Sequence, residues 1–306
     1  MRIAIVGAGA MGSVYAGLLA AAGNDVTAVD VDAAHVEAIR AAGLRVEGAS
    51  GDRIVRIGAT TDPAEVGVVD LVVIATKAFQ ARAAAESARQ LLGEDTTVLT
   101  IQNGLGAADE VAEVVPPAQL LVGVAGGFGA SIVAPGHAHH HGMELVRLGE
   151  RVGPVTARTE RIADVWREAG FSVRTYDDVE RLLWEKLICN ACYAGLCGLL
   201  ETTIGEVIED PQAWSIAVRC AQEALDVGRA CGVALEIDDC ATYVRDYGLA
   251  IAGARPSLLL DLLAGRPTEV EWINGSVPQR GATVGVPAPT NELITTLVLA
   301  KSGRRL

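Results

Sequence analysis

The feature that most constrains this chain lies at its start, where the apolar run Arg2–Val6 leads directly into Gly-Ala-Gly-Ala-Met-Gly at positions 7–12 and the helical pattern Ser13–Ala22. The first glycine allows a tight turn, the second lets the backbone approach a pyrophosphate, and the third lets the helix pack closely on the strand. The helix N-terminus then faces the phosphates. We therefore predict a βαβ unit that binds a nicotinamide dinucleotide through Gly7, Gly9, Ala10, Met11 and Gly12. A glycine-rich corner that binds nothing is the alternative.

Asp30 follows the second apolar run, Asp25–Val29. In such a unit an acidic side chain at this position accepts hydrogen bonds from the adenosine ribose and repels a 2′-phosphate. No lysine or arginine stands in the following segment, 31–35. The sequence therefore favours NAD(H) over NADP(H), unless Asp30 only caps the next helix.

The pattern of apolar residues changes along the chain. The first half alternates Val/Ile-rich runs with Ala-rich amphipathic stretches, which is typical of a parallel sheet covered by helices. From Arg181 onward, long helical patterns replace the strands. We predict an α/β protein with an N-terminal Rossmann-type parallel sheet over residues 1–178 and an all-helical substrate and dimerisation domain over 179–306. The expected strands are Arg2–Val6, Asp25–Val29, Leu71–Ala75, Thr97–Ile101 and Leu120–Val124.

Charge and composition narrow the possible partners. The formal net charge is −13 and the isoelectric point is near 4.9, with no run of basic residues, so nucleic acid and membrane surfaces are not expected partners. The apolar run at the N-terminus is too short for a signal peptide or a spanning helix. We expect a cytoplasmic protein with reduced cysteines, and an apolar helical domain often supplies the surface of a homodimer.

Two polar segments follow predicted strands, where open α/β sheets bind their ligands. Thr76 and Lys77 follow one strand, and Asn103 and Gly104 follow the next. We expect Lys77 and Asn103 to face the cofactor, although a surface lysine and a turn asparagine are ordinary alternatives.

The helical half contains a second polar pair, Lys186 and Asn190, four residues apart and hence on one helix face. A desolvated ammonium there can attract a substrate carboxylate or donate a proton to an alkoxide formed from a ketone. A lysine that merely reaches solvent is the alternative. Further along, Thr268 and Glu271 have capping-box spacing, which predicts a helix that starts here with Glu269 in its first turn.

Two groups of potential metal ligands are also present. His137, His139, His140 and His141 follow a Pro-Gly turn and are expected in a hairpin, and Cys189 and Cys192 have Cys-x-x-Cys spacing. No matching second pair stands at ligand spacing. We therefore predict no metal site, with the cysteines packed as small apolar groups.

Taken in order, these motifs resemble the ketopantoate reductase (2-dehydropantoate 2-reductase) family over nearly the whole chain: the glycine-rich turn, Thr76-Lys77, Asn103-Gly104, Trp184-Glu185-Lys186-Leu187, Gly265–Glu269 and Ile273-Asn274-Gly275. The resemblance implies a Rossmann domain and a helical domain with the substrate in the cleft between them. It assigns catalysis to Lys186 and cofactor and lysine orientation to Glu269. It places Asn190, Ser257 and Asn103 at substrate-binding positions, and Lys77 and Asn103 beside the cofactor.

Two departures from the family pattern concern specificity. Ala194 stands eight residues after the lysine, where the family carries a second substrate-binding asparagine. The loss of an amide that pairs with a substrate group alters discrimination strongly. Asp30 stands near the position where the family carries a basic residue for NADPH. These two departures leave open a cofactor and a substrate that differ from those of the family.

The sequence thus predicts an enzyme that transfers hydride from NAD(P)H to the ketone of a small 2-oxo acid, ketopantoate or a relative of it. Two alternatives stay open. One is a different NAD-dependent hydroxy-acid or opine-type dehydrogenase on the same scaffold. The other is a non-catalytic dinucleotide sensor, which would have no need of the polar residues of the helical half.

Overall fold

The structure, a computed structural model, describes residues 1–127, 129–142 and 145–303. The chain forms two compact units. Unit 1 comprises Met1–Gln102 and Ala107–Val179, and unit 2 comprises Asn103–Gly106 and Glu180–Leu306. The short segment Asn103–Gly106 thus belongs to unit 2, although the chain on both sides of it belongs to unit 1.

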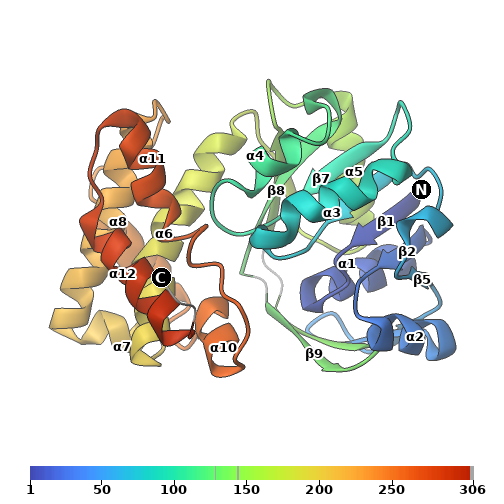
Figure 1. The fold of residues 1–306 in the computed structure, drawn as a ribbon, viewed down its shortest axis with the longest axis horizontal. Helices are drawn as coiled ribbons and strands as arrows, with labels where there is room; N and C mark the ends of the chain where they lie inside the picture. The colour runs from blue at the N-terminus through green and yellow to red at the C-terminus, as the bar shows by residue number, and fades with distance from the viewer. Residues whose placement is uncertain (128, 143–144, 304–306) are drawn as a thin grey trace. The chain divides into compact units, whose positions relative to one another are not determined.

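Unit 1 is built on an eight-stranded sheet with the order β12-β11-β8-β7-β6-β1-β2-β5 (Figure 1). Neighbouring strands are parallel except β8 and β11, which run antiparallel. The predicted α/β fold class with a Rossmann-type sheet is confirmed, and the five expected strands are present with ends that shift by at most two residues. The strands are β1 (Arg2–Val6), β2 (Asp25–Val29), β5 (Gly58–Thr60), β6 (Leu71–Ile74), β7 (Thr97–Thr100), β8 (Leu120–Gly126), β11 (Leu145–Glu150) and β12 (Val173–Thr175).

The order in which successive strands are added to this sheet reverses at β1, which pairs in parallel with β2 on one side and with β6 on the other. Ligands of open α/β sheets bind at such a switch point, beyond the carboxyl ends of the strands. The glycine-rich turn and Lys77 both follow these carboxyl ends. The helices of unit 1 are α1 (Ala10–Ala21), α2 (Ala33–Ala42), α3 (Ala81–Ala88), α4 (Ala107–Ala112) and α5 (Ala157–Glu168), with short 3₁₀ turns at Pro63–Glu65, Ala78–Gln80, Arg89–Leu91 and Pro117–Gln119.

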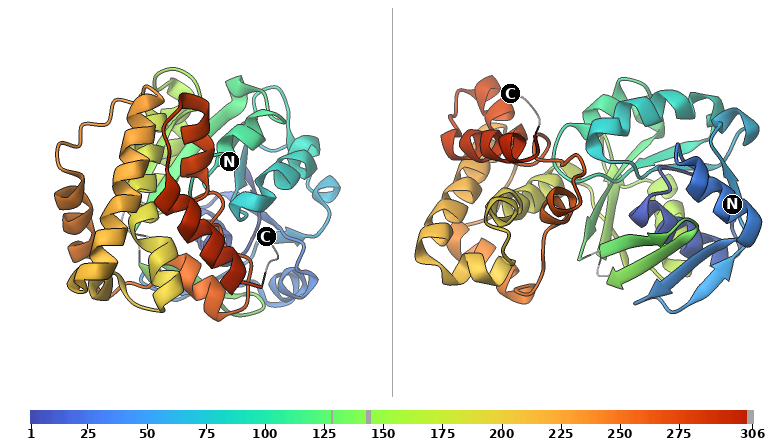
Figure 2. Two further views of the ribbon diagram at one scale, coloured as in Figure 1. Left: turned by 60° about the vertical axis from the view of Figure 1, so that its left-hand side comes forward. Right: turned by 60° about the horizontal axis from the view of Figure 1, so that its bottom comes forward.

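A second, four-stranded sheet with the order β4-β3-β10-β9 also belongs to unit 1. It contains the expected hairpin of histidines, whereas its other two strands were not predicted. Helix α1 contacts this sheet as well as β1 and β2 (Figure 2), which explains why the helix is buried along most of its length. Contact is so close that a Cβ on Gly17 would lie 2.5 Å from Val46 of β3. The strands are β3 (Leu44–Gly48), β4 (Arg53–Val55), β9 (Gly129–Ala134) and β10 (His137–Gly142).

The regular elements of unit 2 are all helices among the residues that the structure describes. Its longest helix, α6, carries the apolar residues around which the other helices pack, and Tyr193 of α6 donates a hydrogen bond to the carbonyl of Val244 at 2.6 Å. None of the described helices is both long and apolar enough to cross a membrane. The helices are α6 (Val179–Leu200), α7 (Ile204–Glu209), α8 (Pro211–Ala230), α9 (Cys240–Ala250), α10 (Ser257–Leu263), α11 (Ser276–Val284) and α12 (Pro289–Lys301).

Candidate functional site

The turn between β1 and α1 combines two crowded glycines with an open one. Gly7 has φ +92°, and a Cβ there would lie 2.6 Å from Thr76 Cγ2. A Cβ on Gly12 would lie 2.0 Å from the carbonyl oxygen of Gly7, so the helix can start against the turn only with glycine at this position. A Cβ on Gly9 would meet none of the described atoms within 4 Å. Gly9 therefore leaves open space beside the backbone, which suits the close approach of a pyrophosphate.

The first turn of α1 keeps its backbone N–H groups available. The helix begins directly after Gly9, earlier than predicted, and Gly9 has no side chain with which to cap it. The first turn, with Ala10, Met11 and Gly12, contains no acidic residue. Free amides at the positive end of a helix dipole bind anions, so this end of α1 fits a phosphate group.

Beside this turn lies a pocket with a volume of about 210 Å³, which is lined by Ala8, Gly9, Asp30, Asp32, His35, Ile132 and Pro135. The two carboxylates have different roles. Asp32 caps α2 by accepting from the N–H groups of Ala34 and His35, while Asp30 accepts from the N–H of Asp32 at 2.9 Å. The capping role that was the alternative for Asp30 thus belongs to Asp32. Both carboxylates give the pocket a negative wall that suits ribose hydroxyls and opposes a 2′-phosphate.

Lys77 follows β6 and is partly buried at the start of the 3₁₀ turn Ala78–Gln80. Its neighbour Thr76 is the residue that crowds Gly7. Because β6 lies beside β1 in the sheet, Lys77 and the glycine-rich turn leave the same edge of unit 1. A lysine at this edge can neutralise the negative charge of a bound dinucleotide.

In unit 2, Lys186 of α6 donates a hydrogen bond from Nζ to Oδ1 of Asn103 at 2.7 Å. Both side chains are partly buried. A charge-assisted bond of this length holds a flexible ammonium in one direction. Two residues predicted to act at the site are therefore in direct contact.

The segment that carries Asn103 is fixed to a second part of unit 2. Leu105 donates its N–H to the carbonyl of Trp272 at 2.9 Å. Gly104 has φ +81°, and a Cβ there would lie 2.1 Å from the same carbonyl oxygen. Glu269, which is 4% exposed, begins the turn that leads to Trp272. The segment thus connects the helix that carries Lys186 to the turn that carries Glu269.

The predicted helix that starts at Thr268 is wrong. Consecutive turns occupy Val270–Gly275, and α11 begins only at Ser276. A continuing α-helix would need the carbonyl of Trp272 for its own ladder, but this carbonyl accepts from Leu105 instead. Glu269 is therefore the first residue of a tight turn and does not lie in the first turn of a helix.

Asn190 lies one helical turn after Lys186 on the same face of α6 and is partly buried, and Ala194 lies a further turn along, 4% exposed. Ser257 is the exposed first residue of α10. Among the described residues, Ser257 makes no hydrogen bond to Lys186 or to Asn103. Asn190 thus lies on the same helix face as Lys186, whereas Ser257 takes no part in the hydrogen bond between Lys186 and Asn103.

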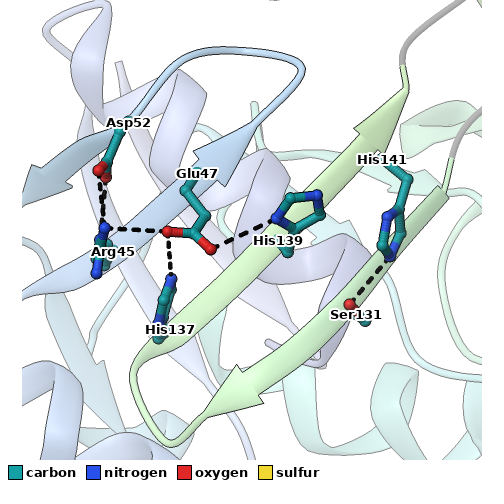
Figure 3. A network of polar contacts seen from close by, with 7 residues as sticks. All are labelled: Arg45, Glu47, Asp52, Ser131, His137, His139 and His141. Carbon is teal, nitrogen blue, oxygen red and sulfur yellow. Dashed lines mark hydrogen bonds and ion pairs between the residues drawn. The ribbon is translucent and has the colours of Figure 1, made fainter.

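The histidines of β10 form a polar surface with residues of β3 and β9. Glu47 lies between His137 and His139, at 3.1 and 3.5 Å, and His141 contacts Ser131 at 3.0 Å (Figure 3). His140, which stands between His139 and His141 in the strand, faces the opposite side of the sheet and is buried. Within residues 1–127, 129–142 and 145–303, no group of three or more His, Cys, Asp or Glu is arranged to hold a metal ion.

The six cysteines are free thiols, all in the helical half of the chain. Five are buried, and burial raises the pKa of Cys197 and of Cys220 to about 12. The expectation that Cys189 and Cys192 are buried is confirmed, whereas Cys231 is exposed. The reason is local: Cys231 lies at the C-terminal end of α8, past its last buried turn.

Several residues around the pocket and the site were not predicted from the sequence. His35, Ile132 and Pro135 line the pocket, but His35 stands far along the chain from the other two, so no local motif connects it to them. Asn274 belongs to a motif that was recognised, yet its side chain is fully buried and donates to the carbonyl of Ala191 and to Asn291. Asn274 therefore joins the turn after Glu269 to α6 and α12.

The comparisons with known proteins span both units. Residues 3–153 match the family model described as ketopantoate reductase PanE/ApbA, and residues 178–302 match the model of its C-terminal part. The chain belongs to the ketopantoate reductase family. As a member of this family it is an oxidoreductase, an NAD(P)-dependent reductase of 2-oxo acids.

Three relatives of the family illustrate its breadth. The 2-dehydropantoate 2-reductase of Streptococcus pyogenes serotype M3 is 30% identical over 98% of each chain. The crystal structure of 2-dehydropantoate 2-reductase from Geobacter metallireducens GS-15 is 34% identical, with a TM-score of 0.91 over 98% of this chain and 99% of that one. A D-mandelate dehydrogenase structure with NADH and anilino(oxo)acetate is 28% identical, with a TM-score of 0.92 over 99% of this chain and 98% of that one. The chain is thus similar both to 2-dehydropantoate 2-reductases and to a D-mandelate dehydrogenase.

Proposed function

We propose that this protein reduces the ketone of a small 2-oxo acid with NADH, and that Lys186 donates the proton. The observation that carries the proposal is the hydrogen bond from Lys186 to Asn103. A lysine that reached solvent would not be held at 2.7 Å by a partly buried amide. NADH bound at the glycine-rich turn supplies the hydride.

Lys186 acts on the oxygen of the ketone. As the carbonyl carbon accepts a hydride, its oxygen gains negative charge, and a nearby ammonium stabilises that charge and then transfers a proton. Asn103 contributes by orientation, because its side-chain oxygen accepts one of the three N–H donors of the ammonium. Proximity and a fixed direction are what allow a flexible lysine to act as a general acid.

The remaining predicted residues position the acid and the lysine. Asn190, on the same face of α6 as Lys186, can donate its amide to the carboxylate of the acid. Ser257 offers a hydroxyl for the other end of the substrate. Glu269, nearly buried in the turn that receives Leu105, supplies a carboxylate that orients Lys186 and the nicotinamide ribose.

The pocket of unit 1 supports NADH as the preferred cofactor. Asp30 and Asp32 both line it, and its described lining residues include no lysine or arginine. A 2′-phosphate bound there would face two carboxylates, whereas ribose hydroxyls can donate to them.

A second candidate is a D-2-hydroxy-acid dehydrogenase that acts on acids with a larger apolar substituent. Ala194 favours it, since a small apolar side chain replaces an amide on the face of α6 that carries Lys186 and Asn190. The similarity to a mandelate dehydrogenase supports it further. An apolar pocket accepts an aromatic or branched substituent more readily than a hydroxyl that would remain unpaired.

The test is a matrix of initial rates. Ketopantoate, phenylglyoxylate and aliphatic 2-oxo acids would each be offered with NADH and with NADPH to the wild type and to Asp30→Asn. The asparagine keeps an oxygen for the N–H of Asp32 and removes the charge. We expect the preference for NADH, measured as the ratio of kcat/KM values, to fall roughly tenfold in the variant.

Asp25→Asn is the matched control, because Asp25 stands at the opposite end of β2 and is exposed. It should leave the cofactor ratio unchanged. The proposal is wrong if the wild type turns over no 2-oxo acid with either cofactor, and its cofactor part is wrong if NADPH is preferred. The rank of phenylglyoxylate against ketopantoate decides between the two candidates.

A further inference from the structure

His35 is a nearly buried imidazole, 4% exposed, in the first turn of α2. Its Nδ1 accepts the backbone N–H of Gly136 at 3.0 Å, from the turn between β9 and β10. Because the amide can only donate, Nδ1 carries no hydrogen, and the ring is neutral with its hydrogen on Nε2. This assignment fixes the direction of the next bond.

Nε2 of His35 lies 3.1 Å from Oγ of Ser13, a fully buried residue of α1. With its hydrogen on Nε2, the imidazole donates to this hydroxyl. The hydroxyl in turn donates to the carbonyl of Ala8 at 2.7 Å. Ala8 stands between Gly7 and Gly9, so a chain of hydrogen bonds ends within the glycine-rich turn.

The other end of this chain is anchored in the second sheet. The carbonyl of Gly136 accepts from the N–H of Arg45 in β3 at 2.9 Å, so both backbone groups of Gly136 are bonded. Gly136 has φ +74°, and a Cβ there would lie 3.0 Å from Ala38 Cβ of α2. The turn is therefore held against α2 at the position where its N–H meets His35.

We propose that His35 is a positioning residue for the cofactor: with Ser13 it fixes the glycine-rich turn to the second sheet and so holds the backbone that receives the pyrophosphate. The inference rests on the proposed binding of NADH at this turn. It assigns a function to the second sheet, which supplies Gly136 to the relay and Ile132 and Pro135 to the wall of the same pocket.

The relay requires a neutral imidazole. A protonated ring would present an N–H to the N–H of Gly136, and this bond would be lost. The charged groups that act on His35 are Asp30 and Asp32, while α1 and the β9–β10 turn present Ser13 and Gly136, which do not ionise. Burial lowers the pKa of His35 and outweighs the opposite effect of the two carboxylates. The relay is thus intact at neutral pH and weakens on acidification.

The experiment compares His35→Leu, His35→Gln and Ser13→Ala with the wild type. His35→Leu removes both hydrogen bonds of the imidazole, whereas His35→Gln keeps an acceptor for the N–H of Gly136 and a donor for Ser13. Ser13→Ala removes the hydroxyl that bonds to the carbonyl of Ala8. Ser87→Ala is the matched control, because Ser87 of α3 also donates to a backbone carbonyl of its own helix, that of Ala84. The readouts are the Kd for NADH by fluorescence titration, kcat at saturating NADH and the pH dependence of the Kd.

We expect His35→Leu and Ser13→Ala to raise the Kd for NADH about five- to tenfold, which corresponds to one buried hydrogen bond, with kcat at saturation nearly unchanged. His35→Gln should restore most of the affinity and should lack the rise in Kd that the wild type shows between neutral and mildly acidic pH. Ser87→Ala should bind like the wild type.

Unchanged affinity in folded His35→Leu and Ser13→Ala would overturn the inference alone, because the wild type would still bind NADH. A loss in His35→Gln as large as in His35→Leu would overturn it as well, since ring shape and not the hydrogen bonds would then matter. Failure of the wild type to bind either dinucleotide would overturn the proposed function, and this inference with it.

Discussion

The two units bury different kinds of reactive side chain. All five histidines lie in unit 1 and all six cysteines in unit 2. In unit 1 the buried polar groups form chains of hydrogen bonds, such as the one through His35, because sheets and turns from distant parts of the sequence must be held together. In unit 2 the thiols pack among alanine and leucine around α6. Under the proposed function, unit 1 therefore couples cofactor binding to proton concentration, whereas unit 2 packs thiols with raised pKa values around the helix that carries Lys186.

The strongest test of this division is Lys186→Ala. The reaction loses its general acid and the positive charge beside the developing alkoxide, so kcat should fall about 10²- to 10⁴-fold. The Kd for NADH should change little, because the groups predicted to hold the pyrophosphate and the ribose belong to unit 1. Steady-state kinetics and fluorescence titration measure the two effects.

Lys301→Ala is the matched control, since Lys301 binds the carbonyls of Gly198 and Leu199 at the end of α6 and has no place in the site. It should retain activity. Near-wild-type turnover in Lys186→Ala would contradict the assigned role, and loss of NADH binding in that variant would contradict the division between the units.

Local sequence signals account for the parts of the molecule that local contacts determine. The glycine-rich turn, the parallel strands and the change to helices follow from spacing and periodicity, and the structure confirms the fold class that they predict. The second sheet was not predicted from the sequence, because β3 and β10 are short, partly polar strands whose parallel pairing joins residues more than 90 positions apart. Nothing local encodes such a partner.

The candidate site shows the same limit. Lys186 and Asn103 were each identified by their own surroundings, but their contact spans 83 positions and was not predictable from either. The helix expected at Thr268 failed because a tertiary hydrogen bond from Leu105 takes a carbonyl that capping-box spacing assigns to the helix. His35 carried no recognisable motif, since its function depends on a turn 101 positions away.

A smaller effect is expected from the pH dependence of stability. Burial lowers the pKa of His35 and of His140, the latter against an opposing backbone hydrogen bond with Gly142. The unfolded chain binds protons more readily at both residues, so unfolding becomes easier as the pH falls through about 6.5. We expect the Tm to fall by a few degrees between pH 7.5 and pH 5.5.

The variant pair His140→Gln and His141→Gln separates this contribution. His140 is fully buried, while its neighbour His141 is exposed on the same strand. The change in Tm over this pH range should be smaller in His140→Gln than in the wild type, and His141→Gln should follow the wild type. An equal pH dependence of the Tm in all three proteins would show that His140 does not contribute to it. The contrast between the units would then rest on His35 alone.

The smallest effect concerns the thiols of unit 2. Burial raises the pKa of Cys240 to about 11 and holds that of Cys192 well above its usual range, so these thiols are neither accessible nor ionised near pH 8. Cys231 is exposed, although its pKa is also raised by partial burial.

Iodoacetamide should therefore label the native chain once and slowly, at Cys231, and six times after denaturation. The single adduct should leave NADH binding and turnover unaffected. Mass spectrometry counts the adducts, and Cys231→Ser should remain unlabelled while native. Rapid labelling at Cys189 or Cys192 would instead show that the helix carrying Lys186 opens to solvent, and the contrast between a proton-sensitive unit 1 and a unit 2 with unreactive buried thiols would no longer hold.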